Sequence, residues 1–233
     1  QEYVVSEAEE NRNEAWRHYS EETLEDLRIG WFTEDMFNQL KDRYGDILEN
    51  AGIHYGMTGD ADGTWMIPHL RQNLRPNLIT CRDPQPEGNS PKYQQSSGSE
   101  HVDNDDAYWA THQGSDTLVL TEGYPDAIAA YDEGFDVIAA GCGSWEGKKD
   151  LVAGYAVKNY NTVFVASDND DTGLENLQEI AAEVADKDRK YTATVKVHDW
   201  GADKPEGYDL DDWCRDNKGE LRELIDNSPT FFD

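Results

Sequence analysis

Acidic side chains follow apolar segments in the second half of the chain, at the points where strands are expected to end. Glu122 follows one such segment, and Asp168 and Asp170 follow another. Asp209 and Asp211 come after a later segment and a loop. Carboxylates held together repel one another unless a cation neutralises them. Because the ligand atoms would be oxygens, with no His or Cys nearby in sequence, the pattern predicts a hard divalent ion, Mg²⁺ or Mn²⁺.

The Asp-x-Asp spacing alone carries little weight in so acidic a chain. There are 28 Asp in 233 residues and five such triplets, against about three expected by chance. Placement distinguishes Asp168 and Asp170, which directly follow a candidate strand and precede the start of a helix. Glu122 lies at a neighbouring strand end, where Gly123 allows close backbone approach. We therefore expect Glu122, Asp168 and Asp170 to form the centre of the site.

The elements that must position these carboxylates alternate between strand and helix from about residue 117. The apolar segments predict strands at 117–121, 136–140, 162–166 and 191–197. Helical periodicity predicts helices at 124–132, 147–159, 172–186 and 210–217. Apolar strands separated by helices are typical of a parallel sheet covered on both faces, so the expected fold class is α/β and Rossmann-like. Ligands of such sheets bind at the carboxyl ends of the strands.

The first half of the chain has a different pattern. It predicts a charged helix at 6–19, a short helix capped by Ser20, and a longer helix that begins after Thr33 and ends before Gly52. Short apolar runs between 53 and 82 favour a small antiparallel sheet, and 83–106 is typical of a long surface loop. We expect three parts: an α+β subdomain at 1–113, an α/β domain at 114–217, and a C-terminal helix or tail at 218–233.

The net charge of −29 argues at first against a nucleic-acid partner, because phosphate attraction comes from clustered Lys and Arg. The acids are dispersed along the chain, which favours a solvated folded surface. We interpret this surface as adaptation to a very salty cytoplasm, where the Debye length falls to roughly 3 Å at 1 M salt.

One stretch opposes the general acidity. Between 64 and 98 the chain has only two acids, Asp83 and Glu87, and four bases, Arg71, Arg75, Arg82 and Lys92. This local excess predicts contacts with the phosphates of a nucleic-acid template or a nucleotide. Four ordinary ion-paired bases are the alternative interpretation.

Cysteine and hydropathy patterns exclude other classes of protein. The three Cys are far apart and odd in number, which offers neither a disulfide framework nor a paired-cysteine zinc site. No apolar run approaches 18 residues, so we expect no membrane association and a cytoplasmic location.

Two motifs together resemble the TOPRIM domain. They are Glu122-Gly-Tyr-Pro-Asp126 after a strand, and Asp168-Asn-Asp170-Asp-Thr-Gly173 between a strand and a helix. Within that family, residues 116–216 look most like DnaG-type primases and the primase halves of viral primase-helicases. The first half also looks like the amino-terminal subdomain of a primase core, through Ile29-Gly-Trp, Trp65-Met-Ile-Pro, Leu78-Ile-Thr-Cys-Arg82 and Pro91-Lys92-Tyr93.

The resemblance implies a nucleotidyltransferase of DNA replication, which makes short RNA primers from nucleoside triphosphates on single-stranded DNA with Mg²⁺ or Mn²⁺. A replicative helicase is a further candidate partner. The implied catalytic and metal-binding residues are Glu122, Asp168 and Asp170, with Asp209 and Asp211 as a further acidic pair beside the metals. The implied nucleotide- or template-binding residues are Arg71, Arg75, Arg82, Lys92, Gly123 and Asp126.

Several alternatives stay open. Asp126 either orients the site or belongs to a helix-capping box, and Asp209 either lies beside the metals or caps the helix at 210–217. The chain as a whole is expected to be the catalytic core of a primase from a halophilic archaeon or one of its viruses or plasmids. A TOPRIM nuclease is a second enzyme hypothesis. A noncatalytic module that binds single strands or a helicase is the alternative from another class.

Overall fold

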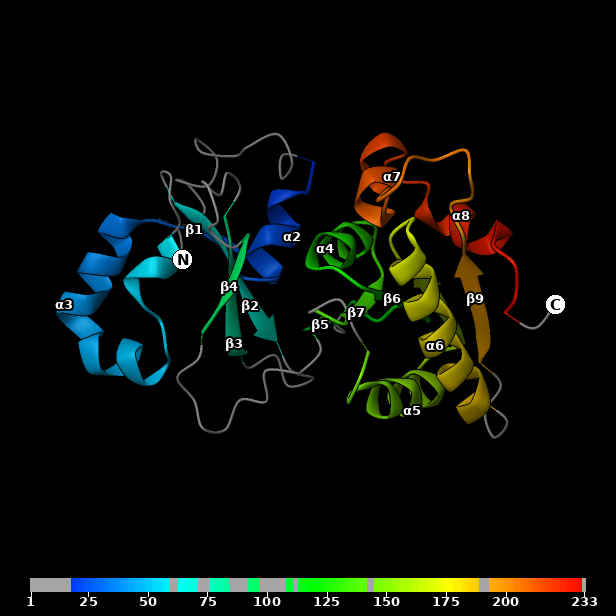
Figure 1. Cartoon of the computed structure of the whole chain (residues 1–233), viewed down its shortest axis with the longest axis horizontal. Helices are drawn as coiled ribbons and strands as arrows, with labels where there is room; N and C mark the ends of the chain where they lie inside the picture. Colours follow the sequence, from blue (N-terminus) through cyan, green and yellow to red (C-terminus); the bar gives the residue numbers. More distant parts are fainter. Residues whose placement is uncertain are drawn as a thin grey trace. The chain divides into compact units, whose positions relative to one another are not determined.

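The computed structural model describes residues 18–58, 63–70, 76–83, 92–96, 108–110, 113–141, 145–188 and 193–231. The chain divides into two compact units, Gln1–Asn104 and Asp105–Asp233 (Figure 1). Most of the helix expected at 6–19 lies outside the described residues, as do Arg71 and Arg75. The domain boundaries expected after 113 and 217 remain predictions. None of the described helices has the length and apolar character needed to span a membrane.

Two capped helices open the described part of the first unit, as the sequence predicts. Helix α2 (Glu21–Asp26) begins after Ser20, whose Oγ accepts the backbone N–H of Thr23 at 3.2 Å. Helix α3 (Glu34–Asn50) begins after Thr33, whose Oγ1 accepts the N–H of Met36 at 3.3 Å. These caps satisfy backbone donors that have no partner inside the helix.

A four-stranded antiparallel sheet completes the first unit, in the order β1-β2-β3-β4. Its strands are β1 (Gly30–Phe32), β2 (Thr64–Leu70), β3 (Pro76–Arg82) and β4 (Tyr93–Gln95), and a short 3₁₀ helix, η2 (Tyr55–Thr58), precedes β2. The expected antiparallel sheet is confirmed, but the loop expected over 83–106 is wrong in part. Tyr93–Gln95 pairs with β3, because Arg82 and Tyr93 are partners in the ladder.

The second unit contains a five-stranded sheet in the order β5-β7-β6-β8-β9. Strands β6 (Thr117–Thr121), β7 (Asp136–Ala139), β8 (Thr162–Ala166) and β9 (Thr194–His198) are parallel, and β5 (Tyr108–Ala110) is an antiparallel edge strand. The helices are α4 (Tyr124–Asp132), α5 (Lys149–Asn159), α6 (Asp171–Asp188), α7 (Leu210–Asp216) and α8 (Leu221–Asn227). The predicted α/β class and parallel strands are confirmed, and β5 was not predicted.

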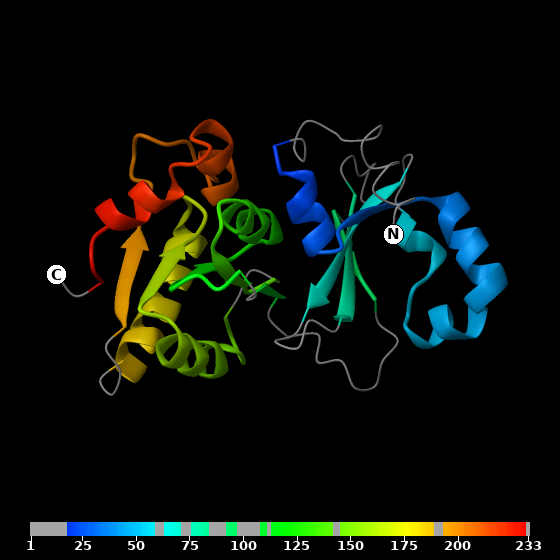
Figure 2. The same cartoon turned by 180° about the vertical axis from the view of Figure 1, so that it is seen from behind.

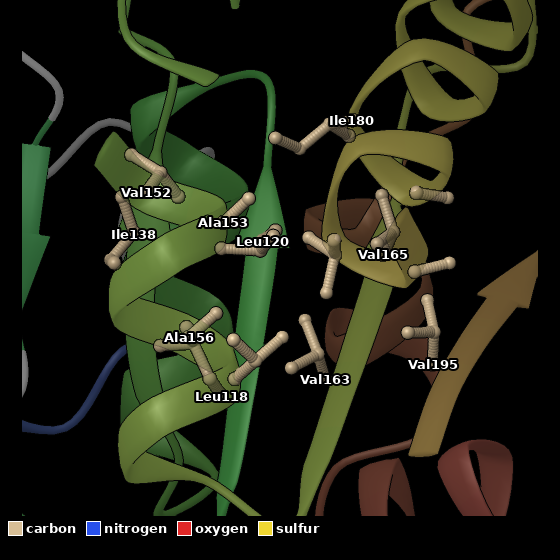
Figure 3. Packing of buried hydrophobic residues seen from close by; sticks show 14 of the residues in the cluster. Leu118, Leu120, Ile138, Val152, Ala153, Ala156, Val163, Val165, Ile180 and Val195 are labelled. Atoms are coloured by element: carbon tan, nitrogen blue, oxygen red, sulfur yellow. The ribbon is translucent and has the colours of Figure 1, made fainter. Parts of the chain in front are cut away.

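The strands of the second unit alternate their side chains between two helical layers. Leu118 and Leu120 of β6 pack with Val152 of α5 and Ile180 of α6 in one buried cluster (Figure 3). Val119, between the two leucines, points to the opposite face by the alternation of a strand. Helix α4 packs on β6 and also on α7 (Figures 1 and 2). This packing brings the start of α7 to the start of α4, near the carboxyl ends of β6 and β8.

Candidate metal centre

Three carboxylates from three separate segments meet in the second unit. Asp126, Asp168 and Asp209 each offer an oxygen, and these oxygens all lie within 4.8 Å of one another. Asp126 belongs to the first turn of α4, Asp168 follows β8, and Asp209 precedes α7. Asp126 is buried and the other two are half-buried. Three carboxylates so close together are within reach of a single cation.

The start of α4 places Asp126 in this cluster. Gly123 is the residue before the helix, and a Cβ built there would stand 2.7 Å from Oδ2 of Asp126. Any larger residue would therefore push the carboxylate away. Oδ1 of Asp126 accepts the backbone N–H of Asp211 at 3.0 Å. Burial, followed by the negative charges of Asp209, Asp168 and Asp211, raises the pKa of Asp126 well above its usual value.

Glu122 lies directly after β6 and carries an unsatisfied oxygen. Its Oε2 is buried and has no hydrogen-bond partner among the described residues. Burial, and then the charge of Asp168, raises the pKa of Glu122 to about 7, while a hydrogen bond with Asn176 opposes the shift. A buried carboxylate oxygen without a donor is costly unless a cation or a proton satisfies it. The oxygen-only ligand set and this orphaned atom fit a hard divalent cation.

Asp170 and Gly173 shape the turn between β8 and α6, which contains Asp168. Oδ1 of Asp170 accepts the N–H of Gly173 at 2.7 Å, so this side chain caps α6. The hydroxyl of Ser167 donates to the carbonyl oxygen of Gly173 at 2.7 Å. A Cβ at Gly173 would lie 2.2 Å from the carbonyl oxygen of Asp168, closer than any side chain allows. Glycine is therefore required for α6 to start this close to the end of β8.

Asp209 has two tasks at once. Its Oδ1 accepts the N–H of Asp212 at 2.8 Å and so caps α7, as one of the two sequence interpretations predicts. The same residue belongs to the carboxylate cluster. Burial raises the pKa of Asp209 to about 7 against the lowering effect of the Asp212 hydrogen bond, and the charges of Asp211, Asp212 and Asp168 add to the rise.

The structure brings most of the predicted acidic residues together. Asp126, Asp168 and Asp209 form the cluster. The charges of Asp168 and Asp170 raise the pKa of Glu122, and the charge of Asp211 raises the pKa of Asp126. The predicted bases of the first unit that the structure describes are Arg82 and Lys92. Nε of Arg82 donates to the Tyr93 hydroxyl at 3.2 Å, and Nζ of Lys92 lies 5.6 Å from the centre of the Tyr93 ring.

The sequence interpretation missed that Asp126 lies inside the carboxylate cluster. It placed Asp126 beside the site or in a capping box, yet the residue before α4 is Gly123, which has no side chain to complete such a box. A signal was present in the sequence. Asp126 is the only acid between Tyr124 and Tyr131, a segment that is otherwise apolar.

The second unit matches a known family in sequence as well as in fold. Residues 119–213, which contain the whole carboxylate cluster, match the Toprim-like family. This stretch is a Toprim-like domain. Its four parallel strands and the antiparallel sheet of the first unit together match the fold of primase cores.

Solved structures of primases share the fold of nearly the whole chain. The zinc-binding and RNA polymerase domains of the Aquifex aeolicus primase match with a TM-score of 0.70 at 21% identity, over 99% of this chain and 59% of that one. A DnaG primase catalytic domain bound to ssDNA matches with a TM-score of 0.69 at 16% identity, over 98% and 76%.

The RNA polymerase domain of Mycobacterium tuberculosis DnaG, in complex with a double-stranded DNA oligomer that has a 6-nucleotide overhang, gives a TM-score of 0.67 at 16% identity. That match covers 99% of this chain and 78% of the other. These likenesses show that the Toprim-like domain and the preceding unit share the fold of primase catalytic cores. The chain spans little more than half of the Aquifex aeolicus chain. No curated protein sequence matches it.

Proposed function

We propose that this chain is the catalytic core of a DNA primase that synthesises short RNA primers from nucleoside triphosphates on single-stranded DNA with Mg²⁺ or Mn²⁺. One observation carries the proposal. The carboxylate cluster lies at the strand ends of a Toprim-like domain, and the fold likeness to primase cores extends over 98% or more of the chain, the antiparallel sheet included.

The carboxylates divide into metal ligands and a proton carrier. Asp126, Asp168 and Asp209 would hold the cation, and Asp170 and Asp211 add negative charge beside it. A bound divalent cation would favour ionisation of an attacking hydroxyl and neutralise charge on phosphate oxygens. Glu122 has a pKa near 7 and a free buried oxygen, so its carboxylate is suited to accept and release a proton at neutral pH.

The bases of the first unit are the proposed contacts with phosphates. Arg82 and Lys92 both contact Tyr93. They belong to residues 64–98, where basic residues outnumber acidic ones. Arg71 and Arg75 belong to the same stretch and remain predicted contacts. Guanidinium and ammonium groups bind phosphate through charge-assisted hydrogen bonds. We propose single-stranded DNA and nucleoside triphosphates as the partners, with a replicative helicase as a further one.

The test is primer synthesis with purified protein, a single-stranded template, labelled nucleoside triphosphates and Mn²⁺ in molar KCl. We expect labelled oligonucleotides from the wild type and a loss of at least about 100-fold in Glu122→Ala and Asp168→Ala. Asp226→Asn, which removes an exposed acid of α8, is the charge-matched control and should retain activity.

The same reaction with a labelled single-stranded template separates the alternatives. A TOPRIM nuclease would cleave labelled DNA through the same carboxylates, and a noncatalytic module would bind the strand without any product at any salt concentration. Activity in Glu122→Ala and Asp168→Ala equal to that of the wild type would contradict the proposed site.

A further inference from the structure

Asn169 stands between two of the proposed site residues, Asp168 and Asp170, yet its side chain is directed to another part of the chain. Its Nδ2 lies within hydrogen-bond distance of three backbone carbonyl oxygens: Gly201 at 3.3 Å, Lys204 at 3.0 Å and Pro205 at 3.0 Å. These carbonyls belong to residues 199–208, which we name the bridging loop because they join β9 to Asp209. One carboxamide therefore contacts three backbone carbonyls in the central part of this loop.

The backbone of Asn169 binds the same loop. Its N–H donates to the carbonyl oxygen of Tyr208 at 2.9 Å, and its carbonyl accepts the N–H of Gly207 at 3.0 Å. The last two residues of the bridging loop are thus tied directly to the residue that follows Asp168. Asp209 directly follows Tyr208, so these backbone hydrogen bonds fix the position of the residue next to Asp209.

Two aromatic side chains support the loop at its ends. Nε1 of Trp200 donates to the carbonyl oxygen of Ser167 at 2.8 Å, and the Trp200 and Tyr208 rings pack edge to face with centroids 5.2 Å apart. Most of the residues between them are exposed, so little apolar burial holds the middle of the loop. Hydrogen bonds from Asn169 provide the order that burial does not, and an unanchored loop of this length would sample many conformations.

We propose that Asn169 is a positioning residue which holds the bridging loop so that Asp209 reaches Asp126 and Asp168, and which thereby sets the affinity of the centre for a divalent cation. The inference rests on the metal centre of the proposed function but not on primer synthesis. Asparagine suits the task because its amide donates to carbonyls without adding charge, whereas aspartate would face those carbonyls with acceptor oxygens.

The first experiment is a Mn²⁺ titration of the full chain, in which electron paramagnetic resonance measures free Mn²⁺. We expect Asn169→Ala to weaken Mn²⁺ binding by about tenfold, the size typical of residues that orient metal ligands. Asn159→Ala is the matched control, because Nδ2 of Asn159 also donates to the backbone, but only to the carbonyl oxygen of Tyr155 within its own helix α5. This control should bind Mn²⁺ as the wild type does.

A double-mutant cycle separates positioning from general damage. If Asn169 acts through Asp209, then Asn169→Ala should change the Mn²⁺ affinity of the Asp209→Asn variant by less than about twofold. Hydrogen exchange should show faster exchange at residues 201–208 in Asn169→Ala, with β6 and β8 as protected as in the wild type. Trp200→Phe keeps an aromatic ring but loses the hydrogen bond to the Ser167 carbonyl oxygen, so it should also weaken Mn²⁺ binding. This second variant tests the proposal if Asn169→Ala does not fold.

The possible results of these experiments distinguish the proposal from its alternatives. Unchanged Mn²⁺ affinity in Asn169→Ala and Trp200→Phe, full additivity with Asp209→Asn, or exchange that rises equally throughout the second unit would overturn the proposal. A wild-type chain that binds no Mn²⁺ would overturn it together with the metal centre. A chain whose Mn²⁺ affinity depends on Asn169 and Asp209 as expected but that makes no primers would overturn only the proposed function.

Discussion

The backbone N–H of Asp211 donates a hydrogen bond to Oδ1 of Asp126 at 3.0 Å, across 85 positions of sequence. This bond joins the first turn of α7 to the first turn of α4, and the two helices are in contact (Figure 1). Asp126 thus supports the fold through one oxygen while its carboxylate also belongs to the cluster.

Replacing Asp126 with Asn should separate these two contributions. Asparagine keeps an oxygen that accepts the Asp211 N–H, so we expect the fold to persist. The negative charge disappears, so Mn²⁺ affinity should fall at least about tenfold, as measured by titration calorimetry. Asp132→Asn, at the other end of α4, is the control and should bind Mn²⁺ normally. Normal Mn²⁺ binding by Asp126→Asn would remove this residue from the centre.

Glu122 should make the stability of the metal-free chain depend on pH. Its pKa is about 7 in the folded chain and near 4.5 when exposed, so folding takes up a proton between these values. A raised carboxylate pKa favours the folded state at low pH, and that advantage is lost as the pH rises through 7. In the presence of a chelator, the melting temperature of Glu122→Gln should be close to that of the wild type near pH 5. At pH 8 it should lie a few degrees above the wild-type value. A melting difference that stays constant over this range would contradict the assignment.

Gly173 should not tolerate even the smallest side chain. Its Cβ would meet the Asp168 carbonyl oxygen at 2.2 Å, so Gly173→Ala should cost about 1–3 kcal/mol in the free energy of unfolding and weaken Mn²⁺ binding. Gly154→Ala on α5 is the matched control, because nothing lies within 4 Å of its added Cβ. That variant should be neutral or more stable by up to about 1 kcal/mol. Urea unfolding measures both.

The dispersed acidity should make the fold depend on salt. With a net charge of −29, self-repulsion should lower the melting temperature in 0.1 M KCl relative to 2 M KCl. Circular dichroism melts in KCl, with sucrose at equal osmolality as the uncharged control, measure the effect. Equal melting temperatures at the two KCl concentrations would contradict the salt-adapted interpretation of the surface.

Local signals sufficed for the long elements of the fold. Ser20 and Thr33 were recognised as helix caps because the capping residue and the following helix are adjacent in sequence. The four parallel strands were recognised because they are mainly apolar and separated by helices of ordinary length.

The short strands β1, β4 and β5 could not be predicted in the same way. Each has three residues, too few to display alternation, and each exists because a longer strand offers it a partner. Trp31 of β1, for example, is defined by its pairing with Trp65, more than thirty residues later. Such pairings are properties of the folded chain.

Some residues of the candidate site could likewise be predicted from the sequence, and others could not. Glu122, Asp168 and Asp170 follow strands directly, so their meeting at one edge of the sheet was predictable from the order of the elements. The approach of Asp126 to Asp209 depends on how α4 packs on α7, which no local pattern indicates. The role of Asn169 depends on the path of the bridging loop, which the sequence does not reveal.

The cluster draws its three carboxylates from widely separated positions, and this spacing sets an order of assembly during translation. Asp126 and Asp168 leave the ribosome before Asp209, which follows Asp168 by 41 positions of sequence. A nascent chain that ends before residue 209 therefore has an incomplete ligand set. The proposed cation would therefore find its full ligand set only after Asp209 has emerged, when nearly all of the Toprim-like stretch, residues 119–213, has been synthesised.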